Sequence, residues 1–111
     1  MPKKIDNVLE KFIKEISKFL GKRLKKIILF GSYARGDYEK NSDIDLMILT
    51  DLDDEELKKY RMKIREIACD IEFDNDVVIS PLLRNISKYN ERIDVIPFYM
   101  NVNKEGVVLN G

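Results

Sequence analysis

Two short, largely apolar runs constrain the fold of this chain more than any other feature. They occupy residues 25–30 (KKIILF) and 44–49 (IDLMIL). Runs of this length are too short to cross a membrane, which takes about 20 apolar residues, and are typical of buried β-strands. Between residues 5 and 20, apolar side chains recur at the i, i+3, i+4, i+7 spacing of a helix, and Gly21 ends that pattern. The chain is therefore predicted to combine buried strands with amphipathic helices.

The next segments continue the alternation of helix and strand. A capping cluster at residues 51–54 precedes a second helical pattern that extends to Ile71, with acidic residues first and basic residues later, as the helix dipole favours. Residues 76–80 (DVVIS) are strand-like and are followed by Pro81, which disfavours a continued strand. The polar residues 84–92 are interpreted as a loop or a weak helix.

The C-terminal segment completes the predicted topology. Pro97 can open a short helix that Gly106 stops, and residues 107–109 can add a last strand. A chain of 111 residues supports one hydrophobic core. We therefore expect a single domain over residues 1–111, with a mixed α/β (α+β) fold in which a mixed sheet of about four strands is flanked by helices.

Charge and cysteine content argue against several classes of protein. The chain has 20 basic and 20 acidic residues and a formal net charge of zero, so bulk electrostatic binding of nucleic acid is not expected. Cys69 is the single cysteine and cannot form an internal disulfide. The sequence contains no signal peptide and no apolar run of membrane length. These features predict a cytoplasmic protein that does not bind a membrane.

The stretch FGSYARGDYEKNSDIDLMI, residues 30–48, begins with a candidate anion-binding turn. If the chain turns at Gly31 and a short helix opens at residues 32–35, the first N–H groups of that helix lack partners within it. Gly31 would allow close approach of a phosphate, Ser32 would add a hydroxyl donor, and Arg35 a charged contact. The loop matches neither the P-loop nor the dinucleotide fingerprint. An ordinary strand-to-helix turn is the alternative.

Two aspartates at the start of the second apolar run suggest a metal site. Asp43 and Asp45 point to one face of a strand, because side chains alternate, while Ile44 packs on the other face. Paired carboxylates repel each other, and they supply the oxygen ligands that Mg²⁺ prefers. A solvated turn is the alternative for an isolated D-x-D. A Gly-Ser pair and a D-x-D at one fixed separation should, however, arise by chance in only about one chain in a thousand of this size.

A third carboxylate would be expected for a site with two metal ions. Asp76 precedes an apolar run as Asp45 does, so we predict that the two occupy equivalent positions at strand mouths. Asp74, two residues earlier on the same face, is the close alternative, and Asp94 is the distant one. Asp76 could also be a plain turn residue within the Asp74–Asp76 cluster.

The stretch from Gly31 to Ile48 (GSYARGDYEKNSDIDLMI) resembles the signature of the nucleotidyltransferase superfamily that includes DNA polymerase β. The chain as a whole resembles the minimal nucleotidyltransferase (MNT) proteins, the antitoxin halves of HEPN/MNT toxin–antitoxin pairs. The continuation Ala34-Arg35-Gly36-Asp37, Ser42 before the first aspartate and the closing segment 101–109 (NVNKEGVVL) fit that family. The resemblance covers most of residues 5–110.

The resemblance implies a mechanism and a set of site residues. Gly31 and Ser32 would hold the triphosphate of ATP, and Asp43 and Asp45 would bind two Mg²⁺ ions. Asp76 would complete the metal site and help to deprotonate the attacking hydroxyl. Arg35 and Ser42 join the predicted nucleotide-binding residues. AMP would move to a tyrosine of a helical HEPN toxin partner.

Three functions remain open from the sequence. The first is AMP transfer to a protein, and the second is neutralisation of a toxin by contact alone, with a silent site. The third, transfer to a small-molecule acceptor, would need an acceptor domain that 111 residues hardly provide. An acceptor pocket is expected from a partner subunit or a homodimer. Candidate contact residues are the aromatic side chains expected to be exposed: Tyr33, Tyr38, Tyr89, Phe98 and Tyr99. Packing of these side chains on their own domain is the alternative.

Overall fold

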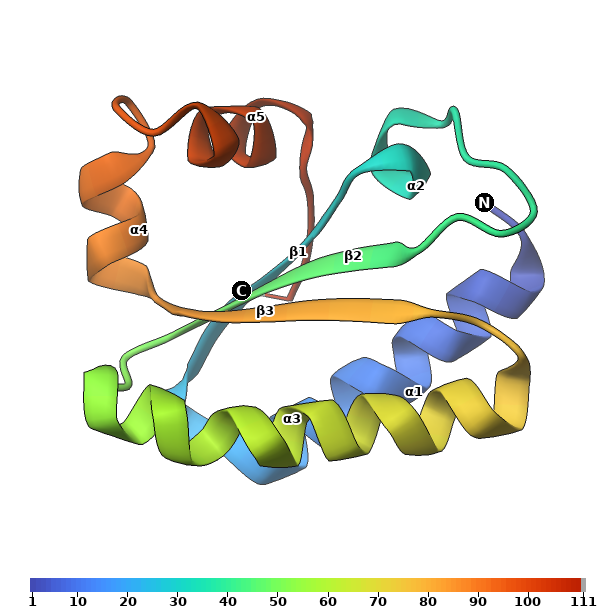
Figure 1. Ribbon diagram of the computed structural model, residues 1–111, viewed down its shortest axis with the longest axis horizontal. Coiled ribbons are helices and arrows are strands. Elements are labelled where there is room, and N and C mark those ends of the chain that lie inside the picture. Colours follow the sequence, from blue (N-terminus) through green and yellow to red (C-terminus); the bar gives the residue numbers. More distant parts are fainter. Residues whose placement is uncertain (111) are drawn as a thin grey trace.

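The two apolar runs form the central pair of strands in a computed structural model that describes residues 1–110. Strand β1 (Leu24–Phe30) pairs antiparallel with β2 (Ile44–Thr50). Strand β3 (Ile79–Asn85) lies parallel to β2, and β4 (Val107–Asn110) lies antiparallel to β1. The strand order is therefore β3-β2-β1-β4, a mixed four-stranded sheet as predicted (Figure 1).

Helices cover both faces of the sheet, as Figure 1 shows. The long helices α1 (Lys3–Leu20) and α3 (Asp54–Asn75) lie side by side on one face. A 3-10 turn, η1 (Gly21–Arg23), joins α1 to β1. On the other side of the sheet lie two shorter helices, α4 (Ile86–Arg92) and α5 (Pro97–Glu105). No helix within residues 1–110 is both long and apolar enough to cross a membrane.

Alternation along β2 divides the core into two clusters. Ile44, Leu46 and Ile48 are buried with the apolar stripe of α1 and with α3. Met47 and Leu49 point the other way and pack with Tyr89 and Val102 of α4 and α5, among others. This two-sided burial explains why the strand is apolar on both faces from Leu46 to Leu49.

The helix starts and stops predicted from the sequence are largely confirmed. Gly21 follows the last residue of α1 with φ 55°. Asp53 caps α3, and its carboxylate accepts a hydrogen bond from the Glu56 N–H at 2.9 Å while the Glu56 side chain accepts one from the Asp53 N–H. The segment interpreted as a loop or weak helix forms α4, capped by the Asn85 side chain, which accepts from the Lys88 N–H.

The bounds predicted for the third strand are wrong. Residues 76–78 connect α3 to the sheet, and β3 begins at Ile79 and continues through Pro81 to Asn85. Asp76 is the C-cap of α3 in the left-handed conformation, with φ 52°, so the chain reaches the sheet only after it. A proline is tolerated within β3 because β3 is an edge strand, where every second N–H faces away from the neighbouring strand and is not needed by the sheet.

Candidate active site

Gly31 joins β1 to the short helix α2 (Ser32–Arg35), and its backbone conformation requires glycine. Its φ of 76° and ψ of −156° lie in a region that side-chain-bearing residues rarely adopt. A Cβ at Gly31 would overlap a carboxylate oxygen of Asp45 and lie 3.1 Å from its Cγ. The turn therefore brings bare backbone against Asp45, and Ser32 starts α2 immediately beside this contact.

Asp43 and Asp45 lie together at the start of β2. Asp45 is in register with Phe30 of β1 and with Ser80 of β3, and Asp43 is exposed just before the strand. The Ser80 hydroxyl donates a hydrogen bond to Oδ2 of Asp43 at 3.4 Å. Ile44 is fully buried on the opposite face, which is the alternation that the sequence predicted.

The electrostatics of this pair favour a cation. Burial raises the pKa of Asp45, the neighbouring carboxylate of Asp43 raises it further, and the Arg35 guanidinium lowers it. A divalent cation held by Asp43 and Asp45 would offset their repulsion and the cost of burying Asp45 in its charged form. Mg²⁺ commonly uses one or two carboxylates together with substrate phosphates and water, so the donor set of Asp43 and Asp45, with the Ser80 hydroxyl beside it, fits that ion.

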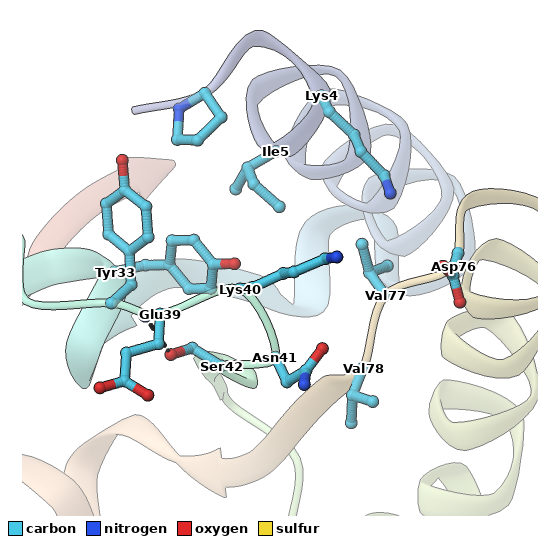
Figure 2. Close-up of a pocket in the computed structure, with 12 residues that line it drawn as sticks. Lys4, Ile5, Tyr33, Glu39, Lys40, Asn41, Ser42, Asp76, Val77 and Val78 are labelled. Carbon is cyan, nitrogen blue, oxygen red and sulfur yellow. Dashed lines mark hydrogen bonds between the residues drawn. The ribbon is translucent and has the colours of Figure 1, made fainter.

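The structure does not bring Asp76 to this pair. Asp76 caps α3, and Figure 2 shows it beyond Val77, at the side of a cavity. The expected equivalence with Asp45 at a strand mouth is not observed, because the register places Ser80 beside Asp45. Within residues 1–110, no three Asp, Glu, Cys or His side chains are grouped to hold a metal ion. A third carboxylate from Asp76 therefore stays a prediction.

The two alternative carboxylates lie on other elements. Asp74 is exposed in the last turn of α3, and Asp94 is exposed in the turn between α4 and α5. Neither side chain joins Asp43 and Asp45 in a cluster of metal-ligating groups among the described residues.

A carboxylate that the sequence reasoning missed lies at the Gly31 turn. Oε1 of Glu105, the last residue of α5, accepts hydrogen bonds from the Gly31 N–H at 3.3 Å and from Nη1 of Arg35 at 3.2 Å. Nε of Arg35 also donates to Asp37 at 3.2 Å. Glu105 is 74 residues from Gly31, so no local spacing indicates this contact. In the sequence, the segment 101–109 predicts the end of a helix and a last strand and fits the family, but it gives no sign of a carboxylate at the Gly31 turn.

Ser42 faces a different environment from Gly31. Its hydroxyl accepts a hydrogen bond from the Glu39 N–H at 2.7 Å and so closes the loop before β2. That loop borders a cavity of about 560 Å³, shown in Figure 2, which Ser42 lines together with Lys4 and Lys40. Gly31, Asp43 and Asp45 do not line this cavity. Ser42 therefore lies on the wall of the cavity, although its neighbour in the chain, Asp43, does not line it.

The aromatic side chains expected at a surface are only partly exposed. Tyr33 is buried and stacks on Tyr38, with ring centroids 4.6 Å apart, and Tyr89 is buried between α4 and the sheet. Tyr99 is half-buried, whereas Phe98 is 43% exposed. The expectation of exposure is wrong for Tyr33 and Tyr89, because both complete the packing of their own domain.

Comparisons with known proteins agree with this geometry. The family model described as "Nucleotidyltransferase domain" matches residues 9–99. A protein of Methanocaldococcus jannaschii that is provisionally named a protein adenylyltransferase is 37% identical over 95 residues, which cover 86% of this chain and 94% of the relative.

Solved structures show the same fold at lower identity. A toxin–antitoxin crystal structure with AMP-PNP matches with a TM-score of 0.56 and 24% identity, over 92% of this chain and 73% of the other. A structure provisionally described as a minimal nucleotidyltransferase matches with a TM-score of 0.54 and 15% identity, over 92% of each chain. The observed α+β arrangement is therefore the minimal nucleotidyltransferase fold.

Proposed function

Because this chain belongs to the nucleotidyltransferase domain family, we propose that it transfers AMP from ATP to a hydroxyl group of a partner protein. The single observation that carries this proposal is the packing of the Gly31 turn against Asp45, with Asp43 beside it. This arrangement sets bare backbone, which a phosphate could approach closely, next to two carboxylates. The name of the relative from M. jannaschii supports a protein acceptor, and the AMP-PNP in the toxin–antitoxin structure supports an adenine nucleotide.

The residues of the Gly31 turn would bind the triphosphate. The Gly31 N–H and the Arg35 guanidinium are directed at one point, since both donate to the same carboxylate oxygen of Glu105. An anionic phosphate oxygen is recognised by the same kinds of donor. The Ser32 hydroxyl would add a further donor from the first turn of α2. Ser42, on the wall of the cavity, would contribute to nucleotide binding through the loop that it closes.

Asp43 and Asp45 would hold Mg²⁺, and the Ser80 hydroxyl beside them would supply a further ligand or an ordering contact, with Asp76 as the alternative third ligand. When bound, Mg²⁺ neutralises charge on the phosphates and lowers the pKa of the acceptor hydroxyl. In the proposed reaction the acceptor oxygen bonds to the α-phosphorus, the bond from that phosphorus to the bridging oxygen of pyrophosphate breaks, and the hydroxyl proton is released to solvent. The site then contributes mainly position and electrostatic stabilisation.

The proposed acceptor is a tyrosine of a helical HEPN toxin in the cytoplasm, and the chain would act as its antitoxin. The toxin–antitoxin assembly of the solved neighbour supports a toxin as the partner. Phe98 and Met100 of α5 are 43% and 45% exposed and are available for contact with a partner, whereas a second copy of this chain is the other candidate for that surface.

A second candidate function is neutralisation of the partner by contact alone. One observation favours it: no third carboxylate joins Asp43 and Asp45 among residues 1–110. A site that has lost catalysis could keep the D-x-D as part of its scaffold.

One labelling experiment separates the two functions. The protein and a candidate HEPN toxin partner are incubated with ATP labelled at the α-phosphate and with Mg²⁺, and label on the partner is measured. We expect transfer with the wild-type chain and none with Asp43→Asn/Asp45→Asn. Asp70→Asn is the matched control, because Asp70 is exposed on α3. Neutralisation of the toxin without any transfer, by wild type and double variant alike, would support the contact mechanism.

A further inference from the structure

The register between β1 and β4 brings Glu105 to the nucleotide turn. Leu29 pairs with Val107 in this antiparallel ladder, and continuing the same register by two residues sets Glu105 opposite Gly31. Gly106 fixes this approach because a Cβ there would overlap the Ile28 side chain and the carbonyl oxygen of Val102. The end of α5 is therefore packed directly on β1, and the Glu105 side chain extends from a fixed position.

The contacts of Glu105 use the donors that would bind a phosphate. Its Oε1 accepts from the Gly31 N–H at 3.3 Å and from Nη1 of Arg35 at 3.2 Å. A carboxylate oxygen and a phosphate oxygen are both anionic acceptors, and both are bound by backbone N–H groups and by guanidinium. The Glu105 side chain is 26% exposed, so solvent and solutes can reach the contact.

We infer that Glu105 is a placeholder for a phosphate group, which occupies the Gly31 and Arg35 donors in the nucleotide-free protein and is displaced when the triphosphate binds. This inference rests on the proposed function. Glu105 acts as a positioning residue, because its contacts keep the Arg35 guanidinium directed at the Gly31 turn. Two anions cannot share these donors without repulsion, so binding of the triphosphate requires the carboxylate to leave.

Competition of this kind lowers the apparent affinity for nucleotide. A ligand binds only to the fraction of molecules in which the donors are free, and its dissociation constant rises as that fraction falls. Removing the charge of residue 105 while keeping its shape should enlarge that fraction. The expected gain is on the order of 10-fold in affinity, which corresponds to the contribution of one hydrogen bond to a charged group.

The test measures binding of inorganic triphosphate and of ATP by calorimetry, without metal and then with Mg²⁺. Wild type is compared with Glu105→Gln, with Glu105→Ala, and with Glu66→Gln, which removes the same charge from an exposed position on α3. We expect both Glu105 variants to bind triphosphate more tightly than wild type in the absence of metal, and Glu66→Gln to bind like wild type. Thermal unfolding shows which variants are folded. If Glu105→Gln does not fold, the affinity of Glu105→Ala is compared with that of wild type instead.

The other outcomes distinguish the inference from the function on which it rests. Wild-type binding with equal or weaker binding by the Glu105 variants would overturn the inference and leave the proposed function standing, with Glu105 as a brace for Arg35. If the Glu105 variants lost only the Mg²⁺-dependent binding of ATP, Glu105 would be identified as a metal ligand, which would also overturn the inference. Failure of wild type and of all variants to bind ATP would refute the proposed function, and the inference with it.

Discussion

Replacing Gly31 by alanine tests whether the turn positions Asp45. The new side chain would adopt a φ of 76° and a ψ of −156°, a conformation that costs about 1–3 kcal/mol for a residue other than glycine. For a domain of this size about 4 °C of melting temperature is lost per kcal/mol, so the midpoint should fall by about 4–12 °C. The methyl group would also overlap a carboxylate oxygen of Asp45, so that side chain must rotate away. A displacement of about 1 Å at a reacting site can cost about 100-fold in rate, and we expect such a loss of AMP transfer.

The matched control for this variant is Gly36→Ala. Gly36 also has a positive φ, 89°, but a Cβ there would meet no heavy atom within 4 Å. Gly36→Ala should therefore lose about 1–2 kcal/mol of stability from strain alone and keep its transfer rate within a few-fold of wild type. The measurements are thermal unfolding by circular dichroism and transfer of labelled AMP at saturating ATP. Equal transfer by the two alanine variants would refute the argument that close approach at Gly31 sets the position of Asp45.

Three further predictions follow from the described contacts. Ser80→Ala should weaken Mg²⁺-dependent ATP binding, because Ser80 is in register with Asp45 and its hydroxyl contacts Asp43. Asp76→Asn should leave this binding unchanged, because Asp76 caps α3. Calorimetry that shows the reverse would assign the third ligand to Asp76. Hydrogen bonds from Arg23 hold the pKa of Glu56 at about 2, below its ordinary 4.5, so its stabilising contribution is complete above pH 4.5 and is lost as pH falls toward 2. Glu56→Gln should accordingly flatten the fall in melting temperature over that range, and an unaltered pH profile would contradict this. Phe12→Ala, at a fully buried position, should cost about 3–5 kcal/mol in urea unfolding, and a loss below about 1 kcal/mol would show that the site collapses around the change.

Local patterns in the sequence were sufficient for most of the fold. The two apolar runs became β1 and β2, and the helical stripe that ends before Gly21 became α1. These predictions succeeded because period and capping are properties of neighbouring residues. The bounds of β3 failed because the left-handed cap at Asp76 delays the entry of the chain into the sheet, and the sequence shows no sign of that delay.

The sequence by itself determined that the Gly31-Ser32 turn and the Asp43-Ile44-Asp45 segment lie together. The turn follows β1 and the aspartates open β2, and a short connection joins these two paired strands. Only the tertiary structure decided which side chains surround them. The register of β3 on β2 set Ser80 beside Asp45, and the register of β4 on β1 brought Glu105 to Gly31. Registers between distant strands depend on the packing of the whole core, so no spacing along the chain predicts them.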